Sequence, residues 1–325
     1  FHRSCNRLQT ASICALKVVV LVMLTEQLCV AAENNNASSP GGALAFGAGK
    51  AVVTPHIRTQ LLSEYSAITP GQTFWIAMRQ QIIPGWHTYW RNPGDSGEPT
   101  AIDWELPPGW RASDIHWPLP GRLPLGPLVN FGYSDEVWLL TKLQAPADLQ
   151  TGQQLELTAN AFWLVCEEVC IPEEGTLQIP LQVTETPQTS PFQQAINFAV
   201  SSLPKPFMGT VSYALIDGIL QFQVANPGNE LPVKVEYFPY LRDVIKHAAP
   251  QELGVHDNQL HLRVASEFAA QPDRLDGLLV FTPSTDSQLL AQGYQISSQQ
   301  LQALNAADVK QAGLTLGTVL LMALA

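Results

Sequence analysis

The chain has 325 residues, which is enough for about two domains once segments outside the fold are set aside. An apolar content of 46% provides a hydrophobic core and excludes wholesale disorder, although charged residues make up only 14%. The net charge of −11, with no cluster of Lys or Arg, argues against a nucleic-acid partner. The 25 prolines and 22 glycines disfavour a helical bundle and favour an all-β fold of short strands joined by turns.

The two ends of the chain are predicted to lie outside the fold. Residues 1–32 combine a basic stretch, an apolar run and small residues near position 32, which is the pattern of a cleaved signal peptide, with an uncleaved anchor as the alternative. Residues 33–43 follow as a polar linker. Residues 312–325 are apolar and uncharged, and we expect them to begin a truncated transmembrane helix rather than to form an amphiphilic tail.

Residues 44–187 are predicted to form the first of two tandem immunoglobulin-like β-sandwich domains. Apolar residues recur at every second position from Leu155 to Trp163, which is the pattern of a strand with one buried face. All eight tryptophans lie in this domain. Segments rich in β-forming residues and bounded by Gly or Pro are 72–78, 136–143, 155–165 and 176–183.

A second immunoglobulin-like domain is predicted over residues 207–295, after a connector helix within 188–206. The helix is indicated by Phe192, Ile196 and Val200, which recur at helical spacing. In the second domain, the dipeptide Asp217-Gly218 predicts a two-residue hairpin between two apolar segments. Further strands are predicted at 233–237, 260–264 and 278–281, and a linker at 296–311.

Cys166 and Cys170 are the two cysteines that remain once the predicted signal is removed. Residues four apart on a straight strand lie about 13 Å apart, whereas a disulfide needs Cα atoms within about 7 Å. The pair can therefore form a disulfide only if the strand ends at Cys166 and residues 167–169 turn back. An exported chain with one close pair is expected to form that disulfide. Closing so small a ring stabilises the fold by only about 2 kcal/mol, which favours a redox-active disulfide over a structural one.

Two other interpretations of the cysteine pair remain. A structural disulfide would belong to a non-catalytic exported interaction module. A copper-handling protein would bind metal through the pair and a histidine, but two cysteines supply only half of a tetrahedral site. The histidines show no ligand spacing except the weak pair His256 and His261, so neither a metal site nor any other cofactor is predicted.

Three motifs carry a resemblance to a known family. They are CEEVCIP at 166–172, GWHTYWRNPGDSG at 85–97 and NFGYSDEVW at 130–138. Together they resemble the periplasmic N-terminal region of the DsbD/ScsB family, bacterial membrane thiol:disulfide interchange proteins, and are most similar to the ScsB-like copper-tolerance branch. The resemblance spans residues 45–310. It implies a tandem immunoglobulin-like region facing the periplasm, followed in the full-length protein by a membrane domain that anchors it in the inner membrane.

The resemblance also implies a protein-disulfide reductase. Its partners would be the membrane electron-transfer domain of the same full-length protein, which supplies electrons, and periplasmic thioredoxin-fold oxidoreductases, which receive them. Cys166 and Cys170 match the catalytic pair, and relatives place the attacking sulfur at the position of Cys170. No cofactor beyond this redox-active disulfide is implied.

Further site residues follow from the same resemblance. Phe131, Gly132 and Tyr133 fall where the family has a cap loop, whose aromatic ring shields the reduced pair from stray oxidants. His87 and Tyr89 match positions where relatives have tyrosines close to the cysteines. Plain core packing is the alternative for Phe131 and for Tyr89.

Negative charge surrounds the cysteine pair in the sequence. Four glutamates lie within the loop or just after it: Glu167, Glu168, Glu173 and Glu174. Such a charge disfavours a thiolate and is expected to raise the pKa of the thiols. We therefore expect low intrinsic reactivity, with activation supplied when a partner docks, and some choice of partner through charge repulsion.

Overall fold

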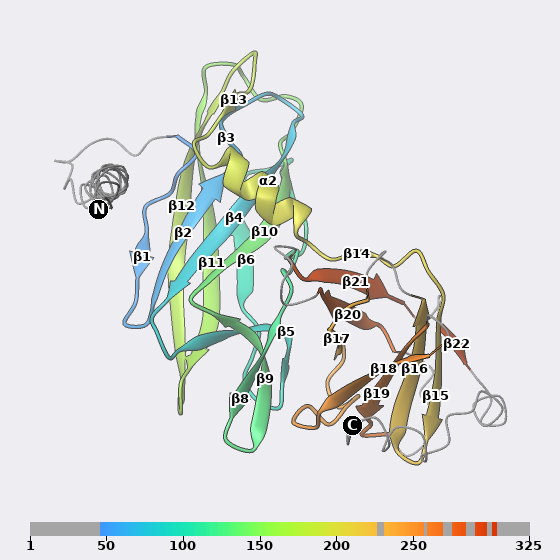
Figure 1. The fold of residues 1–325 in the computed structure, drawn as a ribbon. Coiled ribbons are helices and arrows are strands. Elements are labelled where there is room, and N and C mark those ends of the chain that lie inside the picture. The colour runs from blue at the N-terminus through green and yellow to red at the C-terminus, as the bar shows by residue number, and fades with distance from the viewer. Residues whose placement is uncertain are drawn as a thin grey trace, which may run out of the picture. The chain divides into compact units, whose positions relative to one another are not determined.

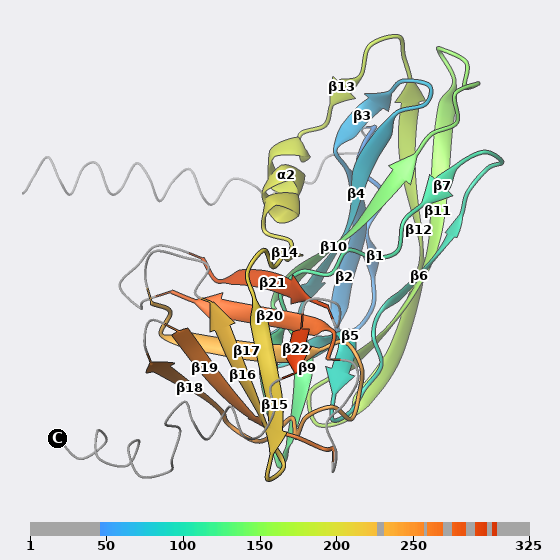
Figure 2. The same ribbon diagram turned by 90° about the vertical axis from the view of Figure 1, so that its right-hand side faces the viewer.

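The computed structural model describes residues 46–225, 231–256, 259–268, 275–283, 290–297 and 301–303. This part of the chain consists of strands with one helix (Figures 1 and 2), which confirms the all-β prediction. The predicted signal peptide, the linker at 33–43 and the predicted start of a transmembrane helix lie outside the described residues. Among the described residues, no helix has the length and apolar character needed to cross a membrane.

The first sandwich consists of two sheets whose facing sides share one core. One sheet has the order β1-β2-β4-β10-β7, and the other has the order β13-β3-β12-β11-β5-β9-β8, with β6 also paired to β11. The strands are β1 (Val52–Val53), β2 (Ile57–Ser63), β3 (Tyr65–Ile68), β4 (Thr73–Ile82), β5 (His87–Gly94), β6 (Ala101–Glu105), β7 (Arg111–Ala112), β8 (Gly121–Leu125), β9 (Leu128–Ser134), β10 (Glu136–Gln144), β11 (Gln154–Cys166), β12 (Cys170–Val183) and β13 (Gln188–Thr189).

The longest hairpin, formed by β11 and β12, follows directly from its sequence pattern. Leu157, Ala159, Ala161 and Trp163 are all buried in the core, which confirms the period-two prediction for this strand. Strand β12 begins at Cys170, six residues before the predicted start of a strand at residue 176. Pro172 lacks a backbone N–H to donate to a neighbouring strand. It is tolerated because β12 pairs with its second neighbour, β3, only at the opposite end of the strand, at residues 182 and 183.

The predicted connector helix is present as α2 (Gln193–Ser201). Its residue Ile196 is buried against Leu62, Ala77 and Leu140, which lie on the side of the first sheet opposite to the main core. Strands β2, β4 and β10 are therefore buried on both faces, and the helix covers an apolar surface that the sandwich core leaves exposed.

The second sandwich also has two sheets, with the orders β14-β21-β20-β17 and β18-β19-β16-β15-β22. Asp217 and Gly218 both have positive φ, which is the turn type predicted for this hairpin. The stretch 296–311, predicted as a linker, contains β22, and the domain limits stay predictions. The strands are β14 (Lys205–Pro206), β15 (Val211–Ile216), β16 (Ile219–Ala225), β17 (Lys234–Pro239), β18 (Gln251–His256), β19 (Gln259–Ala265), β20 (Gly277–Thr282), β21 (Gln292–Ile296) and β22 (Leu301–Ala303).

Candidate redox site

The two cysteines lie at the closed end of the β11–β12 hairpin. All 13 residues of β11 pair with β12, and the last pair is Cys166 with Cys170. Residues 167–169 form the turn, the two Cα atoms are 4.2 Å apart, and the sulfurs form a disulfide. The turn predicted from the spacing of the cysteines is therefore confirmed. Cys166 is buried, whereas Cys170 is partly exposed.

The disulfide lies outside the sandwich core. Along β11, alternate residues face the core, and Val165 is the last of them. Its neighbour Cys166 must face the opposite side of the sheet, because successive side chains of a strand alternate. Cys166 is nevertheless buried, so other parts of the chain cover it on that side.

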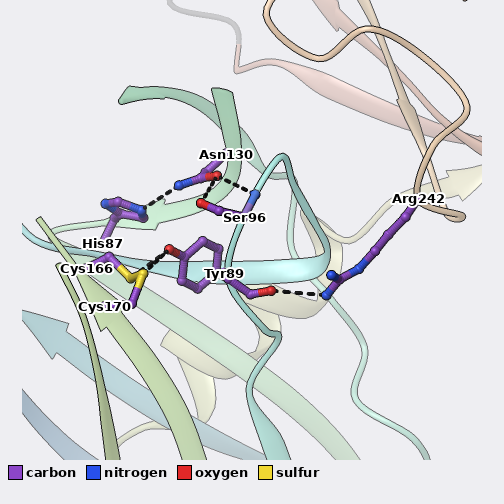
Figure 3. The surroundings of a disulfide bond; sticks show 8 residues. His87, Tyr89, Ser96, Asn130, Cys166, Cys170 and Arg242 are labelled. Carbon is purple, nitrogen blue, oxygen red and sulfur yellow. Dashed lines mark hydrogen bonds between the residues drawn. A yellow bond between two sulfur atoms is a disulfide. The ribbon is translucent and has the colours of Figure 1, made fainter. Parts of the chain in front are cut away.

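Tyr89 on β5 contacts both sulfurs. Its hydroxyl donates a hydrogen bond to Sγ of Cys166 at 2.7 Å and lies 3.2 Å from Sγ of Cys170 (Figure 3). The pairing of His87 with Cys166 brings β5 to this end of β11. Burial raises the pKa of Tyr89, against a smaller opposing effect of the Ser96 hydroxyl. Tyr89 therefore keeps its proton and can act as a hydrogen-bond donor to sulfur.

His87 lies beside the disulfide as a neutral ring. Asn130 accepts hydrogen bonds on Oδ1 from the backbone N–H and hydroxyl of Ser96, at 3.1 and 2.9 Å. Its Nδ2 must therefore donate to His87 Nε2, 3.3 Å away (Figure 3), which puts the ring proton on Nδ1. Burial lowers the pKa of His87 in agreement with this assignment. The ring thus supplies no positive charge for a thiolate.

The cap predicted at residues 131–133 is a strand, not a loop, and the loop prediction is wrong. These residues belong to β9, which pairs with β5 on one side and β8 on the other. Phe131 is buried and makes edge contacts with the rings of Phe238 and His247, at 4.9 and 5.0 Å between centroids. A shielding role for Phe131 stays a prediction, whereas Tyr89 contacts both sulfurs.

The other two residues of the predicted cap hold β9 against its neighbours. Gly132 lies opposite Tyr89 in the ladder, and a Cβ atom there would be 1.9 Å from the carbonyl oxygen of Thr88. The hydroxyl of Tyr133 donates to the carbonyl of Pro118 at 3.0 Å, and burial raises the pKa of Tyr133 well above its usual value. Gly132 therefore allows β9 to approach β5 and Tyr89 closely, and Tyr133 links β9 to the segment before β8.

Three residues that the sequence analysis missed complete the surroundings of Tyr89: Ser96, Gly97 and Asn130. A Cβ atom on Gly97 would be 2.2 Å from Cζ of Tyr89, and Gly97 has φ of +89°. Only glycine fits this close approach. The run of turn-forming residues at 92–97 was a signal for such an approach, but nothing in the sequence said that Tyr89 was the residue approached.

The four glutamates near the cysteines do not form one negative patch. Glu167, Glu168 and Glu174 are exposed, but Glu173 is buried. The expectation that all four crowd the loop is therefore wrong for Glu173. Alternation explains the difference, because Glu173 shares the core-facing positions of Leu177 and the later odd-numbered residues of β12.

Glu173 accepts three hydrogen bonds from side chains. The donors are Thr54 Oγ1 at 2.5 Å, His56 Nδ1 at 2.7 Å and Trp163 Nε1 at 3.2 Å. Burial alone would raise the pKa of Glu173, but the hydrogen bonds and the nearby imidazole outweigh it, so that the pKa is lowered. The buried carboxylate is therefore charged and links β12 to the segment before β2.

The lowered pKa of Glu173 predicts how stability changes with pH. Because the folded-state pKa lies below the unfolded value of about 4.5, the stabilisation is present above that value and is lost as pH falls through the folded pKa. We expect the difference in unfolding free energy between the wild type and Glu173→Gln to be largest above about pH 5 and to shrink towards pH 3. Urea titrations at several pH values measure it. Glu174→Gln, at the exposed neighbour, is the control, and a difference for Glu173→Gln that does not change with pH would contradict the prediction.

Comparison with known families decides what kind of domain surrounds this disulfide. Residues 58–182 match the family model described as the N-terminal region of thiol:disulfide interchange protein DsbD. These residues form a DsbD N-terminal domain. The family resemblance drawn from the three motifs is thereby confirmed, and the matched range includes both Cys166 and Cys170. The DsbD N-terminal domain identifies a thiol–disulfide interchange module, with its cysteine pair at disulfide distance.

One solved structure supports the fold of the DsbD N-terminal domain and of the sandwich that follows it. The N-terminal periplasmic domain of ScsB from Proteus mirabilis is similar over 77% of this chain and 98% of its own, with 18% identity and a TM-score of 0.57. A protein of unknown function from Porphyromonas gingivalis W83 matches with 9% identity over 75% of this chain and 99% of its own, but a TM-score of 0.22 carries no argument. A search of curated proteins gave no match.

A metal ion needs several ligands gathered at one point. No group of three or more His, Cys, Asp or Glu that could hold a metal ion occurs among the described residues. The side chain of His256, one half of the weak histidine pair, lies outside the described side chains. The link to copper tolerance stays a prediction of the sequence resemblance.

Proposed function

We propose that this chain is the periplasmic electron-relay module of a membrane protein-disulfide reductase, acting through Cys166 and Cys170. The observation that carries the proposal is the position of the disulfide at the end of a hairpin, with Cys170 partly exposed and Cys166 buried. A partner needs access to one sulfur only, and the buried one is protected from side reactions. The DsbD N-terminal domain supports the same chemistry.

The hairpin itself gives a reason why the disulfide is not needed as a structural link. Every residue of β11 is already paired with β12, so the two strands are held together without a covalent bond. A disulfide across a five-residue ring removes only about 2 kcal/mol of unfolded-state entropy. Its contribution to stability is therefore small beside that of the strand pairing, which favours a redox role.

The reaction follows from the difference in access between the two sulfurs. In the reduced module, the thiolate of Cys170 attacks one sulfur of a partner disulfide, forms a mixed disulfide and releases the partner's other sulfur as a thiolate. Cys166 then attacks the sulfur of Cys170, which restores the Cys166–Cys170 disulfide and releases the partner as a dithiol. The module is oxidised by two electrons, and the partner is reduced by two.

Tyr89 would assist this sequence by hydrogen bonding. Its hydroxyl reaches both sulfurs and keeps its proton, so it can donate to whichever sulfur carries negative charge. The membrane electron-transfer domain of the full-length protein would supply electrons, and periplasmic thioredoxin-fold oxidoreductases would receive them. The similarity to a periplasmic domain of ScsB supports the periplasm-facing location, and anchoring in the inner membrane belongs to the proposal.

The reduction potential of the pair tests the proposal. The chain carries Ser in place of its three N-terminal cysteines (Cys5, Cys14 and Cys29), is equilibrated with glutathione buffers, and is then thiol-trapped. We expect a potential above about −300 mV and rapid exchange with a periplasmic thioredoxin-fold protein. A pair that stays oxidised below that potential and exchanges with no such protein would make the disulfide structural and overturn the proposal.

A further inference from the structure

A loop at residues 95–98, directly after β5, separates the disulfide site from the second sandwich (Figure 3). We call it the covering loop. A glycine with positive φ lies at or near each end of it: Gly94, the last residue of β5, at 83°, and Gly97 at 89°. Such positions tolerate large changes of backbone angle at little cost. The two glycines therefore allow the backbone of the covering loop to move. Contacts on its two sides hold it in place.

On its inner side, the covering loop closes over Tyr89. The backbone of Gly97 packs on the Tyr89 ring so closely that a Cβ atom has no room. Ser96 donates two hydrogen bonds to the buried Asn130, and Asp95 accepts a hydrogen bond from the backbone N–H of Val129 at 2.7 Å. These contacts place the loop over Tyr89, whose hydroxyl contacts both sulfurs.

On its outer side, the covering loop is held by the second sandwich. Arg242 donates to the carbonyl of Gly97 at 3.1 Å and to the carboxylate of Glu98 at 3.0 Å. The ring Nδ1 of the buried His247 donates to Asp95 Oδ1 at 2.9 Å. Both donors come from the connection between β17 and β18, at residues 240–250. Outward movement of the loop must break these contacts.

We propose that the second sandwich, through Arg242 and His247, holds the covering loop over Tyr89 and thereby sets how readily reductants and partners reach the cysteine pair. This inference rests on the proposed redox function and assigns the second sandwich a role in it. Arg242 and His247 are positioning residues, because they touch the loop and not the sulfurs. Loss of their contacts lowers the free energy of the open form of the loop relative to the closed form, so that the open form is more populated.

The rate at which dithiothreitol reduces the disulfide tests this role in the full chain. In this step, the two thiols of dithiothreitol become its cyclic disulfide, and the Cys166–Cys170 bond is converted to two thiols. We expect Arg242→Met to increase the rate constant about threefold, and Arg242→Met with His247→Phe to increase it about tenfold, a factor that corresponds to ~1.4 kcal/mol in the cost of opening. Arg242→Lys, which keeps a donor, is expected to restore most of the wild-type rate.

Arg263→Met is the matched control. Arg263 lies in the same sandwich and pairs with Glu252 at 3.4 Å, away from the covering loop, so its loss is expected to leave the rate unchanged. Urea unfolding of each variant separates loop opening from general destabilisation. Rates within about twofold of the wild type in folded Arg242→Met and in the double variant would overturn the proposal. If the double variant does not fold, the exposed Arg242→Met decides alone.

The two proposals can fail separately. Reduction by dithiothreitol needs no protein partner, so the covering loop can be shown to control access even if the pair exchanges with no thioredoxin-fold protein. In that outcome, the redox function fails and the loop inference stands as a statement about access. Rapid exchange with a thioredoxin-fold protein, at rates that the Arg242 and His247 variants do not change, would support the redox function and contradict the loop inference.

Discussion

Replacement of Cys170 by Ser is expected to abolish exchange with a thioredoxin-fold partner, with a fall in rate on the order of 10³-fold or more. Cys170 is the partly exposed cysteine of the pair and the proposed attacking residue, and a serine hydroxyl does not replace a thiolate as nucleophile at neutral pH. Cys166→Ser is expected to have a different effect. Cys170 still attacks the partner, but no second thiol resolves the product, so a covalent mixed disulfide accumulates.

Mass spectrometry of the intact covalent complex distinguishes the two variants. The experiment uses the chain that carries Ser at positions 5, 14 and 29, so that no other cysteine can react. The chain with Cys166 and Cys170 both replaced by Ser is the control, and it should form no complex. If Cys170→Ser trapped the partner and Cys166→Ser did not, the assignment of the attacking sulfur would be reversed.

Gly132→Ala is expected to lower the free energy of unfolding by about 3 kcal/mol, a fall in melting temperature of roughly 10 °C. The added Cβ atom would lie 1.9 Å from the carbonyl oxygen of Thr88. Since this oxygen belongs to the backbone, the clash cannot be relieved by rotating a side chain, and β5 must move away from β9. Tyr89 would move with β5, so we also expect the disulfide to be reduced faster by a small thiol.

Gly121→Ala is a closely matched control, because Gly121 on β8 pairs directly with Gly132. A Cβ atom there would meet its nearest neighbour, the carbonyl oxygen of Gly132, at 3.7 Å, which is an ordinary contact. We expect a change in unfolding free energy of no more than about 0.5 kcal/mol. Equal effects of the two substitutions in urea titrations would show that the close approach of β9 and β5 does not constrain the site.

Much of the fold could be predicted because its information is local. The alternation from Leu155 to Trp163 defines the buried face of β11 without any knowledge of its partners, and Asp217-Gly218 defines a hairpin through the backbone angles of two residues. The turn between the cysteines follows from bond lengths alone. The exception is the start of β12: Gly175 predicts a strand boundary before residue 176, but the ladder continues through it.

The surroundings of the disulfide were harder to predict because they depend on pairings between distant segments. The contact of Tyr89 with the sulfurs requires β5 to meet β11 at His87 and Cys166, a register that neither segment specifies. The prediction of a cap loop at residues 131–133 failed for the same reason, since β9 becomes a strand through β5 and β8. Period-two alternation along β12 predicts that Glu173 faces the core. The sequence interpretation of the four glutamates considers only their negative charge and therefore misses this burial.

The β11–β12 hairpin has a further consequence for the kinetics of the redox cycle. The strand pairing extends to Cys166 and Cys170, whose Cα atoms lie 4.2 Å apart, and we expect it to hold them in place without the sulfur bond. When the bond is broken, the two thiols stay within reach of each other, so the resolving step is an intramolecular reaction between groups already in place. Such preorganisation removes most of the entropic barrier that free thiols face, so a mixed disulfide with a partner is expected to be short-lived.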